Sequence, residues 1–241
     1  MSSMNKFNAN EFRRTTYKEQ VTSLLRESIL RGDLAPGTPL VSSALSNQLG
    51  ISRGPIREAL SELQKEGLVV QLQHRTAHVA SLDPKDAWEV YTLRASLEVL
   101  ALRLGLEVAT SDGIHRLLSD LREIAKAMIP LSASSDLPDA VDCDLRFHSR
   151  ICEFGGHSRL RESQSNLDAL IGALFVSIRK NFQRTFDGMA GRHFDLVDII
   201  QSAIAEKDYA RAEDALWQHH HKRAKEFLTL VDEYASLRSG E

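Results

Sequence analysis

The chain has 241 residues, with 30 Lys and Arg against 33 Asp and Glu and a formal net charge of −3 at pH 7. This length favours two domains, each large enough to bury its own core. No apolar run approaches the roughly eighteen residues of a membrane span. The polar residues 1–14 are expected to form a flexible tail without a signal-peptide core.

The two cysteines indicate a reducing compartment. Cys143 and Cys152 lie nine residues apart on one predicted helix, on nearly opposite faces, so they cannot pair within it. We therefore expect a cytoplasmic protein with free thiols.

The first predicted helix begins after Thr16, which forms a capping box with Glu19, and ends at Gly32. Its apolar residues recur at helical spacing: Val21, Leu24, Leu25 and Ile29. A turn follows, and a second helix is expected to be capped by Ser42 or Ser43.

A third predicted helix has two distinct faces. Ser52 can cap it, and its apolar residues recur at helical spacing: Ile56, Leu60 and Leu63. Arg53 and Arg57 are four residues apart and point the opposite way. Two such helices joined by a tight turn at Gly50 are typical of a helix-turn-helix, whose second helix enters the major groove. The alternative is a solvated helix whose arginines contact nothing.

Two short strands are predicted over 68–72 and 77–80, around a polar tip at 73–76. With the three helices they make a winged helix-turn-helix domain over residues 15–80. The residues up to 80 carry a net charge of +3 and the remainder carries −6. A mildly basic N-terminal domain joined to an acidic C-terminal region is consistent with a sequence-specific DNA-binding protein.

Residues 29–37 (ILRGDLAPG), 52–60 (SRGPIREAL) and 63–69 (LQKEGLV) closely resemble the DNA-binding domain of GntR-family bacterial transcription regulators. The resemblance implies that Arg53 reads a guanine edge with support from Arg57, and that the wing tip reaches the minor groove. The implied DNA contacts are Ser43, Ser52, Arg53, Gly54, Arg57, His74, Arg75 and Thr76.

This chain departs from the family pattern at two places in the domain. Ser42-Ser43 stands where relatives usually have an acidic residue followed by a basic one, and that basic residue often touches DNA. Arg75-Thr76 stands where the wing usually has a glycine. Both departures affect the operator sequence that is read.

After the wing, apolar residues recur at helical spacing throughout the rest of the chain. Residues 81–86 are expected to be a linker, in which Asp83 can cap a helix that begins with Pro84. An all-helical domain over 87–232 and a flexible tail over 233–241 follow. Further helices are predicted at 112–129, 138–154, 157–182, 191–206 and 209–232. The first long helix is expected to bury Val90, Leu93, Leu97, Leu100, Ala101 and Leu104. The fold class is thus mainly α.

Arg94 lies partly on the inward face of this long helix, where an unpaired guanidinium is costly. It can pair with Glu98 one turn later, or it can grip a ligand carboxylate through two parallel hydrogen bonds. Residues 93–98 (LRASLE) followed by Ala101 resemble the opening helix of the FCD ligand-binding domain of the FadR subfamily. The resemblance implies that Arg94 contacts an organic-acid effector.

Asp144 and His148 are four residues apart on one predicted helix face. By itself this spacing is more typical of a side-chain hydrogen bond, but it also matches the Asp-x-x-x-His metal motif of the FCD family. The family pattern places two further histidines at positions 197 and 219. His219 is present, whereas Val197 cannot bind a metal.

Other histidines can replace the missing ligand. His193 lies one helical turn before position 197 on the same face, and His220 or His221 follows His219. Three outcomes stay open here. The first is a divalent transition metal (zinc- or nickel-like) held by Asp144, His148 and His219. The second is a metal-free pocket in which Arg94, Asp144 and the histidines bind the effector directly. The third is a polar helix face without any ligand.

These patterns favour a ligand-responsive transcription regulator, in most such cases a repressor. The expected partners are a palindromic DNA operator, a small carboxylate effector and a second copy of the chain, with no membrane. One alternative is a metal-dependent enzyme built on Asp144, His148 and His219, for which no general-base motif is found. The other is an architectural DNA-binding protein without an effector.

Overall fold

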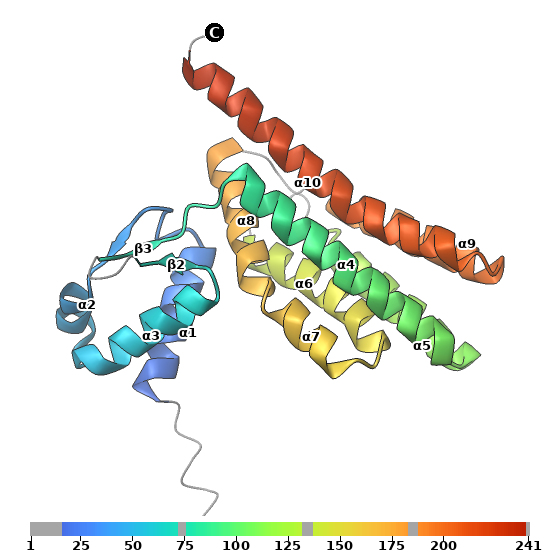
Figure 1. Ribbon diagram of the computed structural model, residues 1–241, viewed down its shortest axis with the longest axis horizontal. Coiled ribbons are helices and arrows are strands. Elements are labelled where there is room, and N and C mark those ends of the chain that lie inside the picture. The colour runs from blue at the N-terminus through green and yellow to red at the C-terminus, as the bar shows by residue number, and fades with distance from the viewer. Residues whose placement is uncertain (1–15, 72–75, 132–136, 183–187, 240–241) are drawn as a thin grey trace, which may run out of the picture.

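The computed structural model describes residues 16–71, 76–131, 137–182 and 188–239, which form a small winged-helix domain beside a larger helical bundle (Figure 1). The expected N-terminal tail and the wing-tip residues His74 and Arg75 lie outside the described residues. None of the helices within these ranges is long and apolar enough to span a membrane.

The winged-helix domain packs three helices around one core: α1 (Tyr17–Leu30), α2 (Ser42–Leu49) and α3 (Arg53–Lys65). The capping box of Thr16 and Glu19 is confirmed. Gly50 closes α2 with a φ of 66°, a left-handed conformation that favours glycine. The core residues include Val21, Leu25, Ile29, Ile56, Leu60 and Leu63. The prediction that Leu24 joins them is wrong, because its side chain is 47% exposed.

Two predicted helix caps differ in the structure. Neither Ser42 nor Ser43 caps α2, because both lie inside the helix and Val41 takes the capping position. Ser52 precedes α3 as predicted but makes no side-chain capping bond.

A three-stranded antiparallel sheet covers the core in the order β1-β3-β2. Its strands are β1 (Pro39–Leu40), β2 (Val69–Val70) and β3 (Ala77–Val79). Pro39 pairs with His78, and Val69 pairs with Val79. The sequence predicted two strands and missed β1, because two residues are too short to show a strand period.

Seven helices of the described chain build the larger domain: α4 (Pro84–Val108), α5 (Ser111–Ala127), α6 (Leu137–Phe154), α7 (Ser158–Ser165), α8 (Asp168–Phe182), α9 (Met189–Ala205) and α10 (Tyr209–Ser239). The single helix predicted over 157–182 is in fact two, because Asn166 ends α7 and Leu167 turns into the core. Helix α10 continues through most of the expected C-terminal tail. It lies side by side with α4 (Figure 1).

Helix α4 buries a different face from the one that its leucines predicted. Leu93 and Leu100 are 50% and 42% exposed, so their predicted burial is wrong. The face that packs into the bundle instead includes Tyr91, Arg94 and Glu98. The prediction used only the spacing of apolar residues, so it could not detect a buried face that contains polar and charged residues.

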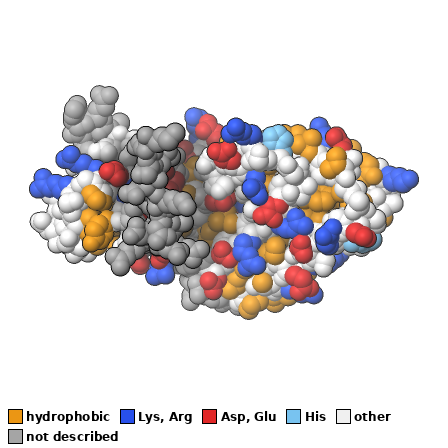
Figure 2. Space-filling view, turned by 90° about the horizontal axis from the view of Figure 1, so that it is seen from below, with side chains coloured by type: hydrophobic (Ala, Val, Ile, Leu, Met, Phe, Trp, Pro, Cys, Tyr) orange, Lys and Arg blue, Asp and Glu red, His pale blue; other side chains and the backbone are white. Residues whose placement is uncertain are grey.

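On the face shown in Figure 2, acidic and basic side chains are interspersed over the described part of the helical domain.

Helix α8 joins the two domains. Its small residues Ala169 and Ala173 pack against the core of the winged-helix domain. The approach is close, because a Cβ atom on Gly172 would lie 2.6 Å from Leu30, and one on Gly67 would lie 2.6 Å from Leu170. Helix α8 therefore contributes to both domains.

Candidate functional site

The first candidate site is a hollow of about 480 Å³ on the winged-helix domain, between the start of α3 and the wing. Ser43, Arg53, Arg57 and Thr76 all line it. Within the described part of the chain, neither arginine forms an ion pair, and both are exposed. Ser52 and Gly54 are exposed at the start of α3. The structure thus brings four of the predicted DNA contacts to one surface.

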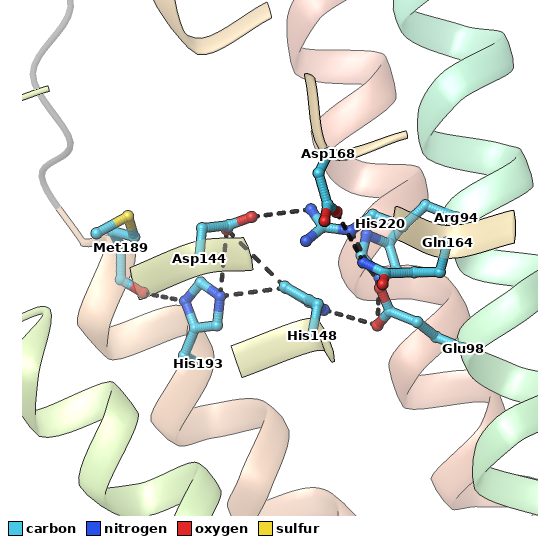
Figure 3. A network of polar contacts seen from close by, with 9 residues as sticks. All are labelled: Arg94, Glu98, Asp144, His148, Gln164, Asp168, Met189, His193 and His220. Carbon is cyan, nitrogen blue, oxygen red and sulfur yellow. Dashed lines mark hydrogen bonds and ion pairs between the residues drawn. The ribbon is translucent and has the colours of Figure 1, made fainter. Parts of the chain in front are cut away.

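The second candidate site is a cavity of about 400 Å³ inside the helical bundle. The four residues predicted from the sequence all line it: Arg94 on α4, Asp144 and His148 on α6, and His219 on α10. His193 on α9 lines it as well, and Figure 3 shows its ring pointing toward Asp144 and His148. Four helices therefore converge on one buried polar cluster.

Arg94 connects two buried carboxylates. Its Nη1 donates to Asp144 Oδ2 at 2.8 Å, and its Nε lies 3.1 Å from Glu98 Oε1. Only 1% of Arg94 is exposed, and its Nη2 has no hydrogen-bond partner among the described residues. Burial alone would raise the pKa of Asp144, but the charge of Arg94, together with the neighbouring His193 and His148, outweighs it and holds that pKa well below its usual range.

Glu98 is fully buried and binds two imidazoles at once. Its Oε2 lies 2.6 Å from His148 Nδ1 and 3.0 Å from His220 Nε2. Burial would raise the pKa of Glu98, but His148 and His220 outweigh this effect and lower it below its usual range. Glu98 is therefore a charged acceptor at the inner end of the cluster.

The hydrogen bonds assign the tautomers of two histidines. His193 Nδ1 lies 2.7 Å from the carbonyl oxygen of Met189, and His148 Nδ1 contacts the Glu98 carboxylate. Both partners only accept, so both Nδ1 atoms carry the proton. Each Nε2 then presents a lone pair, and the two Nε2 atoms lie 3.3 Å apart.

Other electron-rich atoms face the same point. Asp144 Oδ1 lies 3.5 Å from His193 Nε2 and 3.9 Å from His148 Nε2. The ligand atoms of His148, His193 and His219 lie within 4.8 Å of one another. Burial lowers the pKa of His148 to about 3, and burial with the neighbouring imidazoles lowers that of His219 well below its usual range. The cluster therefore favours neutral imidazoles, which is the form that binds metal ions.

The remaining histidines and Val197 have other roles. Val197 is fully buried in the apolar core. His220 donates to Glu98 instead of facing the three converging imidazoles. The ring of His221 packs against Trp88, at 4.9 Å between ring centroids.

Sequence reasoning missed the polar residues around the cluster. The hydroxyl of Tyr91 is buried without a hydrogen-bond partner among the described residues. Arg223 lines the cavity, bonds Glu226 at 3.1 Å and lies over the ring of Phe175. Tyr91 precedes Arg94 by three residues and so lies on the same helix face. This spacing was the one feature of the sequence that could have placed Tyr91 at the cavity.

A winged-helix domain joined to a bundle with a buried polar cavity defines a class of DNA-binding regulators with a ligand-binding domain. Residues 17–79 match the description "Bacterial regulatory proteins, gntR family", and residues 89–222 match the FCD domain. The chain therefore belongs to the GntR family of bacterial regulatory proteins and carries an FCD domain.

Similar proteins are transcription regulators. The chain is 26% identical over 199 residues to the HTH-type transcriptional repressor GlaR of Escherichia coli K12, covering 81% of this chain and 88% of that protein. It is 26% identical over 196 residues to the gluconate operon transcriptional repressor of Bacillus subtilis 168, covering 81% of this chain and 78% of that protein. The solved structure of Escherichia coli McbR/YncC shares the fold, with a TM-score of 0.67 at 20% identity, covering 92% of this chain and 100% of that one. The protein is thus a ligand-responsive DNA-binding regulator, and members of this class are not enzymes.

Replacing Arg94 with alanine should leave two buried carboxylates without their cation and destabilise the fold by roughly 3–5 kcal/mol. Urea unfolding at pH 7 in the presence of a chelator would measure the loss. Arg146→Ala is the control, since Arg146 and its partner Asp142 are mostly exposed on α6, and it should leave the unfolding midpoint nearly unchanged. Equal midpoints for the two variants would contradict a supporting role for Arg94.

Proposed function

We propose that the protein is a homodimeric repressor of bacterial genes that binds a palindromic operator and responds to a small organic acid, with a divalent metal ion in the cavity. Acting on the chromosome, it would work in the cytoplasm. The convergence of His148 Nε2, His193 Nε2 and Asp144 Oδ1 on one buried point carries the sensing part of this proposal.

DNA reading is assigned to the first two turns of α3. Arg53 and Arg57 are exposed there, free of ion pairs within the described residues, and they line one hollow with Ser43 and Thr76. An arginine at the start of a helix in the major groove can donate two hydrogen bonds to guanine O6 and N7. We assign this contact to Arg53, with Arg57 beside it, and assign Ser52, Gly54, His74 and Arg75 to the surrounding contacts.

Arg53→Ala should weaken binding to an operator, selected from random DNA by the wild-type protein, by roughly 1–3 kcal/mol, because a bidentate guanine contact is lost. Binding to unrelated DNA should change less, since phosphate contacts remain. Gel-shift titration measures both. Lys126→Ala, which removes an exposed cation from α5 of the helical domain, is the control. Wild-type affinity for the operator in Arg53→Ala would show that α3 does not read it through this residue.

The exposed face of α4 is a suitable dimer interface. Leu93, Leu97, Leu100 and Leu104 recur at intervals of four and three residues, the spacing of a helix–helix seam. Leu93 and Leu100 are about half exposed, while Leu97 also contacts the core. A two-fold axis along this stripe would pair the same face of both copies, and a symmetric operator requires such a pair.

The double variant Leu93→Lys/Leu100→Lys should be monomeric at micromolar concentration, because two lysines would face their own copies across the axis. Sedimentation equilibrium measures the mass, and circular dichroism checks that the helices persist. Leu24→Lys, an equally exposed leucine on α1, should leave the dimer intact. A monomeric wild-type protein, or a dimeric double variant, would contradict this interface.

The cluster fits a divalent transition metal. Two atoms bound tetrahedrally to one zinc ion at about 2.0–2.2 Å lie roughly 3.3–3.6 Å apart. The separations of 3.3 Å between His148 and His193, and of 3.5 Å between His193 and Asp144, match this value, while the 3.9 Å between His148 and Asp144 is a few tenths of an ångström longer. We propose that Asp144, His148, His193 and His219 are the ligands, and that His193 replaces the histidine that relatives have at position 197. Bound there, the ion would supply positive charge for an anionic effector.

An organic acid is the expected effector. The unpartnered Arg94 Nη2 and Tyr91 hydroxyl are buried donors at the cavity, as an oxyanion ligand requires. Arg192, Arg211 and Arg223 add further guanidinium groups to the lining. The related repressor of Bacillus subtilis is named for a gluconate operon, and gluconate is a carboxylate. We therefore propose a carboxylate held between the metal, Arg94 and Tyr91.

His193→Val should lower the affinity for Zn²⁺ by more than about tenfold, because one of the protein ligands is lost. Calorimetric titration of chelator-treated protein measures it, and wild-type protein should bind one ion per chain. His193→Val combined with Val197→His moves the imidazole to the family position and should restore affinity. His221→Gln is the control, because the His221 ring packs against Trp88. Absence of zinc binding in the wild type would favour a metal-free anion pocket.

A further inference from the structure

We propose that Glu98 is a positioning residue of this centre: it does not bind the metal, but it holds His148 with Nε2 facing the metal point and so determines metal affinity. The inference rests on the proposed metal site. It concerns a buried acid on α4 that contacts His148 from the side opposite to His193 and Asp144 (Figure 3).

The imidazole of His148 spans two partners. Its Nδ1 lies 2.6 Å from Glu98 Oε2, whereas its Nε2 faces His193 Nε2 at 3.3 Å. A neutral imidazole carries one proton, and the carboxylate keeps it on Nδ1. Without Glu98 the proton could move to Nε2 and block the lone pair that the metal needs.

Glu98 is itself held from two sides. His220 Nε2 lies 3.0 Å from the same Oε2, and Arg94 Nε lies 3.1 Å from Oε1. Arg94 also donates through Nη1 to Asp144 Oδ2, which leaves Asp144 Oδ1 toward the imidazoles. Arg94 thus orients Asp144 through a hydrogen bond, and its charge lies beside Glu98, the carboxylate that contacts His148.

The distances distinguish this arrangement from a second metal site. Glu98, His148 and His220 also form a compact group of potential ligands. However, 2.6 Å is too short for two atoms bound to one zinc ion, which lie roughly 3.3–3.6 Å apart. It is instead the length of a short charge-assisted hydrogen bond, since such N–H···O bonds usually measure about 2.7–2.9 Å. His220 consequently belongs to the support of Glu98 and not to the ligands.

A buried carboxylate behind a ligating histidine also makes the metal-binding nitrogen a stronger donor, and its removal typically costs 10–100-fold in metal affinity. Glu98→Gln keeps the size and one acceptor oxygen of the side chain but removes its charge. We expect Zn²⁺ affinity to fall about 10–100-fold with the stoichiometry still at one. The Co²⁺ absorption spectrum should keep the intensity of a four-coordinate site, because no ligand is lost.

Calorimetry with Zn²⁺ alone and Co²⁺ absorption are measured on the full chain in wild type, Glu98→Gln, His220→Gln and Glu153→Gln. Glu153 is exposed near the end of α6, so its variant loses the same charge without touching the cluster. His220→Gln should retain one ion and bind it at least tenfold more tightly than His193→Val does. Glu153→Gln should match the wild type.

One measurement needs no variant at position 98. In metal-free wild-type protein at neutral pH, long-range ¹H–¹⁵N correlation should show His148 with its proton on Nδ1, with the signals assigned by their loss in His148→Gln. This result supports the inference even if Glu98→Gln fails to fold, and a proton on Nε2 would overturn it.

The other outcomes are equally decisive. Wild-type affinity in Glu98→Gln would overturn the positioning role while leaving the metal site intact. Two zinc ions in the wild type and one in Glu98→Gln would make Glu98 a ligand of a second site. A wild-type chain that binds no zinc would overturn the metal centre, and the positioning role with it.

Discussion

The helical domain depends on one buried guanidinium. Arg94 neutralises Asp144 and contacts Glu98 in a region where none of the three is more than 6% exposed. Burying charges costs several kcal/mol per ion before their attraction is counted, and a well-packed apolar replacement is often as stable. Stability alone therefore does not explain why the centre of this bundle is ionic. A centre that must attract ligands explains it better, because the charges then fix the direction of the groups that bind.

Local signals in the sequence predicted the winged-helix domain well. The capping box at Thr16, the left-handed Gly50 and the opposed faces of α3 depend on neighbouring residues, so they can be recognised without the fold. Strand β1 could not be predicted in this way, because its two residues become a strand only through their pairing with β3. The break between α7 and α8 likewise follows from packing, since Leu167 turns into a core that the sequence does not display.

The polar cavity was predictable in part. Asp144 and His148 share a helix face through their spacing, and Arg94 stands out as a cation among apolar neighbours. The partnership of Glu98 with His148 joins residues fifty positions apart, so only the three-dimensional structure reveals it. Positions 193 and 197 lie one helical turn apart on the same face of α9. Spacing alone therefore could not decide whether a histidine at 193 can take the place of the one expected at 197. The burial of the α4 leucines was mispredicted for a related reason. A stripe of apolar residues does not distinguish a face covered by the core from a face covered by another protein.

Helix α8 packs against both domains, so it separates the cavity from the winged-helix core by a fixed distance along one helix. Ala169 and Ala173 pack on the winged-helix core, whereas Phe175 lines the cavity beneath Arg223. Ala169 and Phe175 are six residues apart, about 9 Å along the helix axis. A helix moves as a stiff rod over so short a distance. An anion that displaced Phe175 would therefore act on a helix whose contact with the winged-helix domain lies within two turns.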